Sequence, residues 1–149
     1  MKGIKILFLL LIIFLPSCFG DCKDGHSSIK IVNNSDIRIG FSDWITQDII
    51  YNYEVDFYAC MRPISANSFI DFFCLDGNRI ICWENVLNKG KTIHIFFVDI
   101  ELYEQYWKQP FDTLLKYVPV LHCYRLKLED LQRMNWTVVY PPEESDDTD

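Results

Sequence analysis

The chain has 149 residues, of which 50% are hydrophobic and 15% aromatic, so it can build the core of one folded domain and is not a disordered polymer. The formal net charge is −7 at pH 7. Because Lys2 and Lys5 lie near the start, the part from Cys18 onward carries about −9. Such an acidic domain, without a basic stripe interleaved with aromatic residues, repels phosphate backbones, which argues against nucleic-acid binding.

Residues 1–17 have the composition of a secretory signal peptide. Two lysines precede the unbroken apolar run 6–15, and Pro16 and Ser17 follow it. A run of this length is too short to cross about 30 Å of hydrocarbon, so we do not expect a permanent transmembrane helix. The sequence therefore predicts an exported protein.

The motif Leu15-Pro16-Ser17-Cys18 resembles the lipobox of bacterial lipoproteins. The resemblance implies that the thiol of Cys18 receives diacylglycerol, and that cleavage frees its amine for a further acyl chain such as palmitate. Pro16 departs from the usual pattern. We predict lipidation at Cys18 and an anchor in the outer membrane of the cell envelope, with the occupied face left open. The alternative is ordinary cleavage near Gly20, which would give a soluble secreted protein.

The segment 18–28 is rich in glycine, serine and aspartate, and it is predicted to be a tether between the lipid and the domain. The folded domain is expected over 29–142. The polar, acidic stretch 143–149 is expected to be a disordered tail.

The first half of the domain consists of short β-like runs. Residues 29–32 and 37–41 flank a turn-forming segment at 33–36, and 49–58 is rich in Ile, Tyr, Val and Phe. The dipeptide Asp76-Gly77 predicts a hairpin between two further strands. Residues 92–98 are apolar on both faces apart from His94, as expected of a central strand. The expected strands here are 29–32, 37–41, 49–58, 69–75, 79–83 and 92–98.

After residue 98, the apolar residues follow the spacing of a helix and no longer the alternation of a strand. Asp99 is positioned to cap a short helix that ends at Pro110, and 111–117 continues as a further helical turn. A strand over 120–128, a helical turn over 128–134 and a closing strand over 136–140 follow. The sequence predicts a mainly β fold, a two-layer β-sandwich of immunoglobulin-like or similar type. Its helical insert around 99–117 is expected to cover one edge or end.

The segment 120–141 contains Leu128-Glu129-Asp130-Leu131, then Asn135-Trp136-Thr137, and finally Tyr140-Pro141. This pattern resembles the ending of a group of small uncharacterised exported Bacteroidetes proteins, and 31–39 resembles their opening. The resemblance implies export from a bacterial cell but supplies no activity and no catalytic residues. From the residues themselves, we expect Leu128, Leu131 and Trp136 to be core residues.

Six cysteines in an exported protein favour a disulfide. If Cys18 is acylated, an odd number remains: Cys22, Cys60, Cys74, Cys82 and Cys123. The sequence does not decide their connectivity. Cys74, Cys82 and Cys123 lie in apolar runs, where free thiols behave as small hydrophobic side chains.

No catalytic, cofactor-binding or metal-binding set is predicted. There is no Cys-x-x-Cys, His-x-x-x-His, phosphate loop or Gly-x-Ser-x-Gly motif. His94 and His122 could be neighbours if their strands pair, and a Cys123–His94 nucleophile pair is conceivable on residue type alone. If these side chains form a catalytic site, the protein would be a small envelope enzyme, which is the alternative function.

The sequence therefore predicts a membrane-anchored lipoprotein that acts as a non-catalytic binding or structural module of the envelope. Trp44, Tyr51 and Tyr53 are the residues expected to form a contact surface. Whether the partner is a protein or a glycan is left open.

Overall fold

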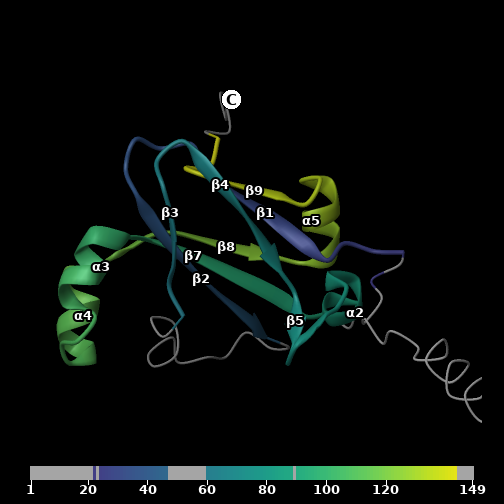
Figure 1. Ribbon diagram of the computed structural model, residues 1–149, viewed down its shortest axis with the longest axis horizontal. Coiled ribbons are helices and arrows are strands. Elements are labelled where there is room, and N and C mark those ends of the chain that lie inside the picture. The colour runs from purple at the N-terminus through teal and green to yellow at the C-terminus, as the bar shows by residue number, and fades with distance from the viewer. Residues whose placement is uncertain (1–21, 23, 47–59, 89, 144–149) are drawn as a thin grey trace, which may run out of the picture.

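The computed structural model describes Cys22 and residues 24–46, 60–88 and 90–143. The predictions for 1–17 and 49–58, and for the tail after Glu143, lie outside the described residues. In the described part, two β-sheets enclose an apolar core, and short helices lie around them (Figure 1).

The first sheet has three strands in the order β4-β1-β9. The central strand β1 (Ser28–Asn33) pairs antiparallel with β4 (Ser68–Phe73) and parallel with β9 (Thr137–Tyr140). Ile29 and Ile31 alternate with more exposed neighbours and are fully buried. This period of two, visible in the sequence, turns one face of the sheet towards the core.

The second sheet has four strands in the order β3-β2-β7-β8, all antiparallel: β3 (Arg62–Ile64), β2 (Ile39–Thr46), β7 (Thr92–Asp99) and β8 (Val120–Leu126). Strand β7 lies between two neighbours, which confirms the expected central strand. Its residues Ile93, Ile95 and Phe97 are fully buried and face the first sheet.

One apolar cluster joins the inner faces of both sheets. Ile31 and Val138 from the first sheet belong to the same cluster as Phe41 and Phe97 from the second. At the edge, the hydroxyl of Tyr124 on β8 donates a hydrogen bond of 2.6 Å to the carbonyl of Val139 on β9. The predicted mainly β, sandwich-like fold is confirmed.

Two helices form the expected insert, α3 (Ile100–Tyr106) and α4 (Phe111–Tyr117), at the left of Figure 1. A second, smaller cluster packs them against the four-stranded sheet, with Val98, Leu114 and Val118 at its centre. The predicted cap is confirmed, since Asp99 accepts hydrogen bonds from the backbone N–H groups of Glu101 and Leu102 at 2.9 and 3.1 Å. None of the helices in the described ranges is long and apolar enough to span a membrane.

The hairpin near Gly77 forms, but its turn lies one residue later than predicted. Strand β5 (Leu75–Asp76) pairs with β6 (Arg79–Ile80) so that Asp76 lies opposite Arg79. The turn is therefore Gly77-Asn78 and not Asp76-Gly77. Gly77 has φ +58°, a conformation that glycine adopts without steric penalty.

The predicted strand 79–83 ends early, because α2 (Trp83–Leu87) begins at Trp83. The predicted helical turn after β8 is α5 (Leu128–Arg133). Leu131 and Trp136 belong to the core and Leu128 packs against it, as expected. These contacts pack α5 and the residues that follow it against the sandwich.

Replacing Asp99 by alanine should lower the free energy of unfolding by about 0.5–2 kcal/mol, because the first backbone N–H groups of α3 lose their acceptor. Urea denaturation followed by circular dichroism measures the change. The matched control is Asp99→Asn, which retains a capping oxygen and should stay close to wild type. Equal losses in both variants would contradict a capping role.

Candidate functional site: the N-terminal junction

A disulfide between Cys22 and Cys82 joins the segment before β1 to the segment between β6 and α2. Their Cα atoms are 5.1 Å apart, and 60 residues separate them in sequence. The sequence left this pairing open because spacing alone does not distinguish among the cysteines. Cys82, expected among the free apolar cysteines, is in fact bonded, whereas Cys74 and Cys123 are free.

His26 makes a second link to the same segment. Its backbone N–H donates to both carboxylate oxygens of Glu84, at 3.0 and 2.9 Å, and its ring Nδ1 lies 2.8 Å from Glu84 Oε1. Gly25 lies between the two links. A Cβ at this position would come within 2.7 Å of Glu84 Oε2 and 3.0 Å of Cys82 Sγ, so a larger residue would have to displace the Glu84 carboxylate and crowd the disulfide.

The ring of His26 also stacks on Trp136, with ring centroids 4.2 Å apart and planes 14° apart. Trp136 itself has φ 56°, a conformation uncommon for a bulky side chain, and it is buried on its other side by the core. We call Cys22, Gly25, His26, Cys82, Glu84 and Trp136 the N-terminal junction.

Backbone hydrogen bonds complete the attachment. The N–H of Trp83 donates to the carbonyl of His26 at 2.9 Å, and that of Cys74 to the carbonyl of Ser27 at 3.0 Å. Cys22 and residues 24–28 are thus bound to the folded domain, although the sequence assigns them to a tether. No local pattern in the sequence indicates this attachment, because every partner lies more than 40 residues away.

Two opposing effects set the pKa of Glu84. Partial burial acts to raise it, but the hydrogen bonds from the ring and backbone of His26, together with the charge of His26, outweigh burial. The net result is a pKa below its ordinary value of 4.5. The carboxylate is therefore ionised at neutral pH and holds the junction most strongly in that form.

The predicted contact surface is only partly within the described residues. Trp44 lies on β2, is 36% exposed, and stands opposite His94 in register, on the face of the sheet away from the core. Tyr51 and Tyr53 lie outside the described residues, as does the proposed lipidation site Cys18.

The two histidines of the predicted strands are not brought together. His122 pairs with Phe97, whose side chain is in the core, whereas His94 pairs with Arg125 on the opposite face. Burial, assisted by Arg125, lowers the pKa of His94. Within the ranges that the structure describes, no group of three or more His, Cys, Asp or Glu side chains is placed to hold a metal ion.

The thiols of Cys74 and Cys123 are not activated for nucleophilic attack. Burial raises the pKa of Cys74 to about 11, with further contributions from Asp43 and Asp76. Burial also raises the pKa of Cys123, against the opposing effect of Arg125. Since the thiolate is the nucleophile, both groups stay in the unreactive form near neutral pH.

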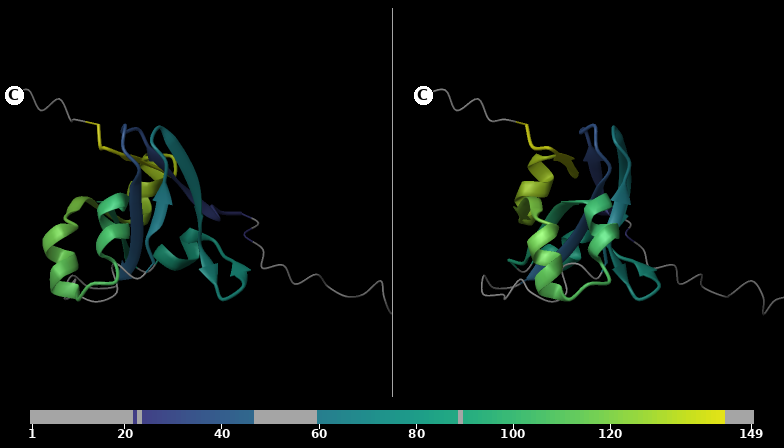
Figure 2. Two further views of the ribbon diagram at one scale, coloured as in Figure 1. Left: turned by 60° about the vertical axis from the view of Figure 1, so that its left-hand side comes forward. Right: turned by 90° about the vertical axis from the view of Figure 1, so that its left-hand side faces the viewer.

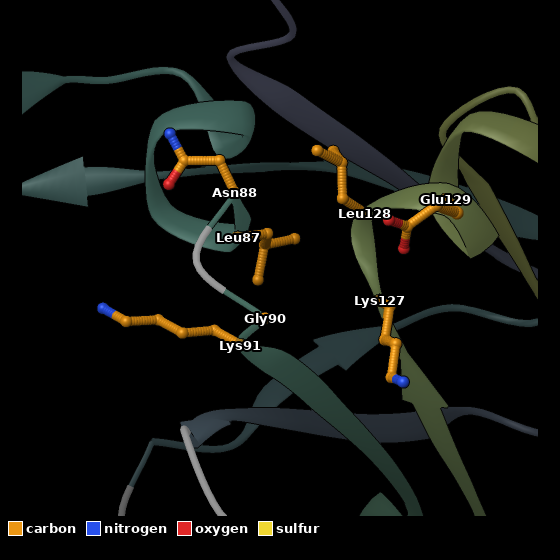
Figure 3. A pocket seen from close by; sticks show the side chains of 7 residues that line it. All are labelled: Leu87, Asn88, Gly90, Lys91, Lys127, Leu128 and Glu129. Atoms are coloured by element: carbon orange, nitrogen blue, oxygen red, sulfur yellow. The ribbon is translucent and has the colours of Figure 1, made fainter.

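A pocket of about 380 Å³ lies between the end of α2 and the start of α5 (Figure 3). Its lining includes Lys91, Lys127 and Glu129. Figure 3 shows the two lysine side chains pointing away from one another, so their charges do not converge on a common ligand position. The lining also contains Leu87 and Leu128, so it mixes apolar with charged side chains.

No family model, curated protein or solved structure matches the chain. The N-terminal junction is the best-defined arrangement of polar and covalent contacts in the described residues, and it is the candidate site.

Replacing Cys82 by serine should lower the free energy of unfolding by about 2–4 kcal/mol, because the unfolded chain regains the entropy of a long loop. Thermal or urea unfolding without reductant measures this loss. Cys22→Ser should give a similar loss, and the double variant should lose no more than either single one. Additive losses would contradict the pairing.

Replacing Glu84 by glutamine should lower the free energy of unfolding by about 1 kcal/mol at pH 7, because a charged acceptor is lost. The folded pKa of Glu84 is depressed, so its contribution is present above the unfolded value of 4.5 and is lost as pH falls through the folded pKa. Urea titrations from pH 7 to pH 3 should show the difference between variant and wild type shrinking below about pH 4.5.

The matched control is Asp24→Asn, an exposed acid two residues before His26. This variant should show a much smaller difference from wild type at every pH. A Glu84→Gln difference that stays constant across the range would contradict a role for the ionised carboxylate.

Proposed function

We propose that this protein is an exported lipoprotein, anchored in the outer membrane through acylated Cys18, whose β-sandwich is a non-catalytic binding or structural module of the cell envelope. The observation that carries the proposal is the Cys22–Cys82 disulfide. Disulfides persist in oxidising compartments and are rare in the cytosol, so this bond supports export.

The position of the disulfide supports a role in anchoring. Cys22 follows Cys18 by four residues, and the junction secures the chain from this point onward by covalent, ionic and stacking contacts. A lipid on Cys18 would therefore be coupled to the body of the domain and not to a long flexible linker. Two or three acyl chains would anchor firmly, since each buried CH₂ contributes roughly 0.8 kcal/mol.

The chemistry of the described side chains favours a binding or structural role over the enzyme alternative. His94 and His122 lie on opposite faces of the sheet, and the thiols of Cys74 and Cys123 have raised pKa values. The register places Cys123 opposite Phe96 and His94 opposite Arg125, so Cys123 and His94 share the outer face of the sheet. Burial raises the pKa of the Cys123 thiol, which favours the unreactive thiol over the thiolate that a nucleophile requires.

Full-length protein expressed in a bacterial host should incorporate an alkyne analogue of palmitate and appear in the membrane fraction, whereas Cys18→Ala should lose both properties. Gel fluorescence after coupling to an azide dye measures the label. The matched control is Cys22→Ala, which removes a thiol four residues away and should keep the label.

Label that persists in Cys18→Ala would overturn the lipoprotein proposal. Exported wild-type protein that stays unlabelled and soluble would favour the secreted alternative.

A further inference from the structure

The hairpin β5–β6 presents an apolar surface to solvent. Leu75 is 62% exposed, and its pairing partner Ile80 is 43% exposed. Phe73, also 43% exposed, lies on the same side, because the intervening Cys74 points inward and is buried. We call Phe73, Leu75 and Ile80 the hairpin face. Figure 2 shows the hairpin projecting from the body of the domain.

The hairpin face lies next to the point at which the anchor segment joins the domain. Ile80 precedes Cys82 by two residues, and the Cα atom of Cys82 is 5.1 Å from that of Cys22. The four residue steps from Cys22 back to Cys18 span at most about 14 Å when fully extended. Since the headgroup layer of each leaflet is roughly 5–8 Å thick, an acylated Cys18 holds this end of the domain at the membrane surface.

Charge does not prevent the hairpin from approaching lipid. Within 75–80 the charged residues are Asp76 and Arg79, which are partners in register, so the hairpin has no net charge. The rest of the domain is acidic and would be repelled by anionic headgroups. The neutral, apolar hairpin is therefore the part of this end that is best suited to the interface.

Another exposed apolar group lies far from the anchor. Leu115 on α4 is 44% exposed, comparable to Ile80. Figure 1 and the left view of Figure 2 place α4 away from the hairpin and from the start of the described chain. Exposure alone therefore does not single out the hairpin face; its position beside the junction does.

We propose that the hairpin face of Phe73, Leu75 and Ile80 is a membrane-contact site that enters the headgroup and acyl boundary of the lipid surface carrying the anchor. This inference rests on the proposed function. The acyl chains supply the affinity, and the hairpin sets the orientation of the domain on the membrane.

The experiment uses the processed, acylated protein carrying Leu75→Trp, reconstituted into vesicles of phosphatidylethanolamine and phosphatidylglycerol. The new indole should show a blue-shifted emission and lose intensity when the lipids carry brominated acyl chains. Interfacial side chains lie roughly 5–10 Å into the boundary region, so bromine near the carbonyl end should quench more than bromine near the terminal methyl. Subtraction of wild-type emission removes the four native tryptophans.

The matched control is Leu115→Trp, the same substitution on α4, which should not be quenched beyond wild type. Ile80→Trp, on the partner strand, provides a second reporter of the hairpin and should behave like Leu75→Trp. Incorporation of the palmitate analogue at Cys18 is measured on the same samples.

Acylated protein in which neither hairpin variant is quenched would overturn the membrane-contact site while leaving the anchor intact. Equal quenching of Leu75→Trp and Leu115→Trp would also overturn it, because the domain would then have no fixed orientation. Absence of the fatty-acid label from Cys18 would overturn the proposed function and this inference together.

Discussion

The covalent bond between Cys22 and Cys82 determines how the start of the described chain relates to the rest of the fold. Without it, the segment before β1 would be held only by hydrogen bonds and one stacked ring pair, which are individually weak in water. With it, His26 is kept beside Glu84 and Trp136 at little further entropic cost. Trp136 and Trp83 belong to the central core, so the junction is supported by the same apolar layer that holds the two sheets together.

Patterns in the sequence predicted the elements whose stabilising interactions lie between residues close together in the chain. Asp99 was correctly expected to cap α3, and 92–98 was correctly expected to be a central strand, because both signals can be read from a few neighbouring residues. Where partners are distant, prediction was wrong or left open. The disulfide pairing, the attachment of 24–28 and the transition to helix at Trp83 all depend on packing across the domain.

The same distinction applies to the candidate site. Cysteine composition indicated that a disulfide was plausible, but only the fold brings Cys82 to Cys22. The hairpin was predicted from its turn dipeptide, yet its turn lies one residue later than predicted, so Asp76 pairs with Arg79. In this register Leu75 lies directly opposite Ile80, which makes their side chains neighbours on one face of the hairpin.

The parallel pairing of β1 with β9 places the start of β1 and the end of β9 at opposite ends of the sandwich. Ser28 lies at the junction end of β1, whereas Asn33, at the other end, pairs with Tyr140, after which the described chain ends at Glu143. A six-residue strand is about 17 Å long. The acidic sequence of 143–149 therefore begins at the end of the sandwich opposite the junction. In an anchored protein this arrangement places Tyr140 and Glu143 at the end of the sandwich far from the headgroups, while the uncharged hairpin face lies towards them.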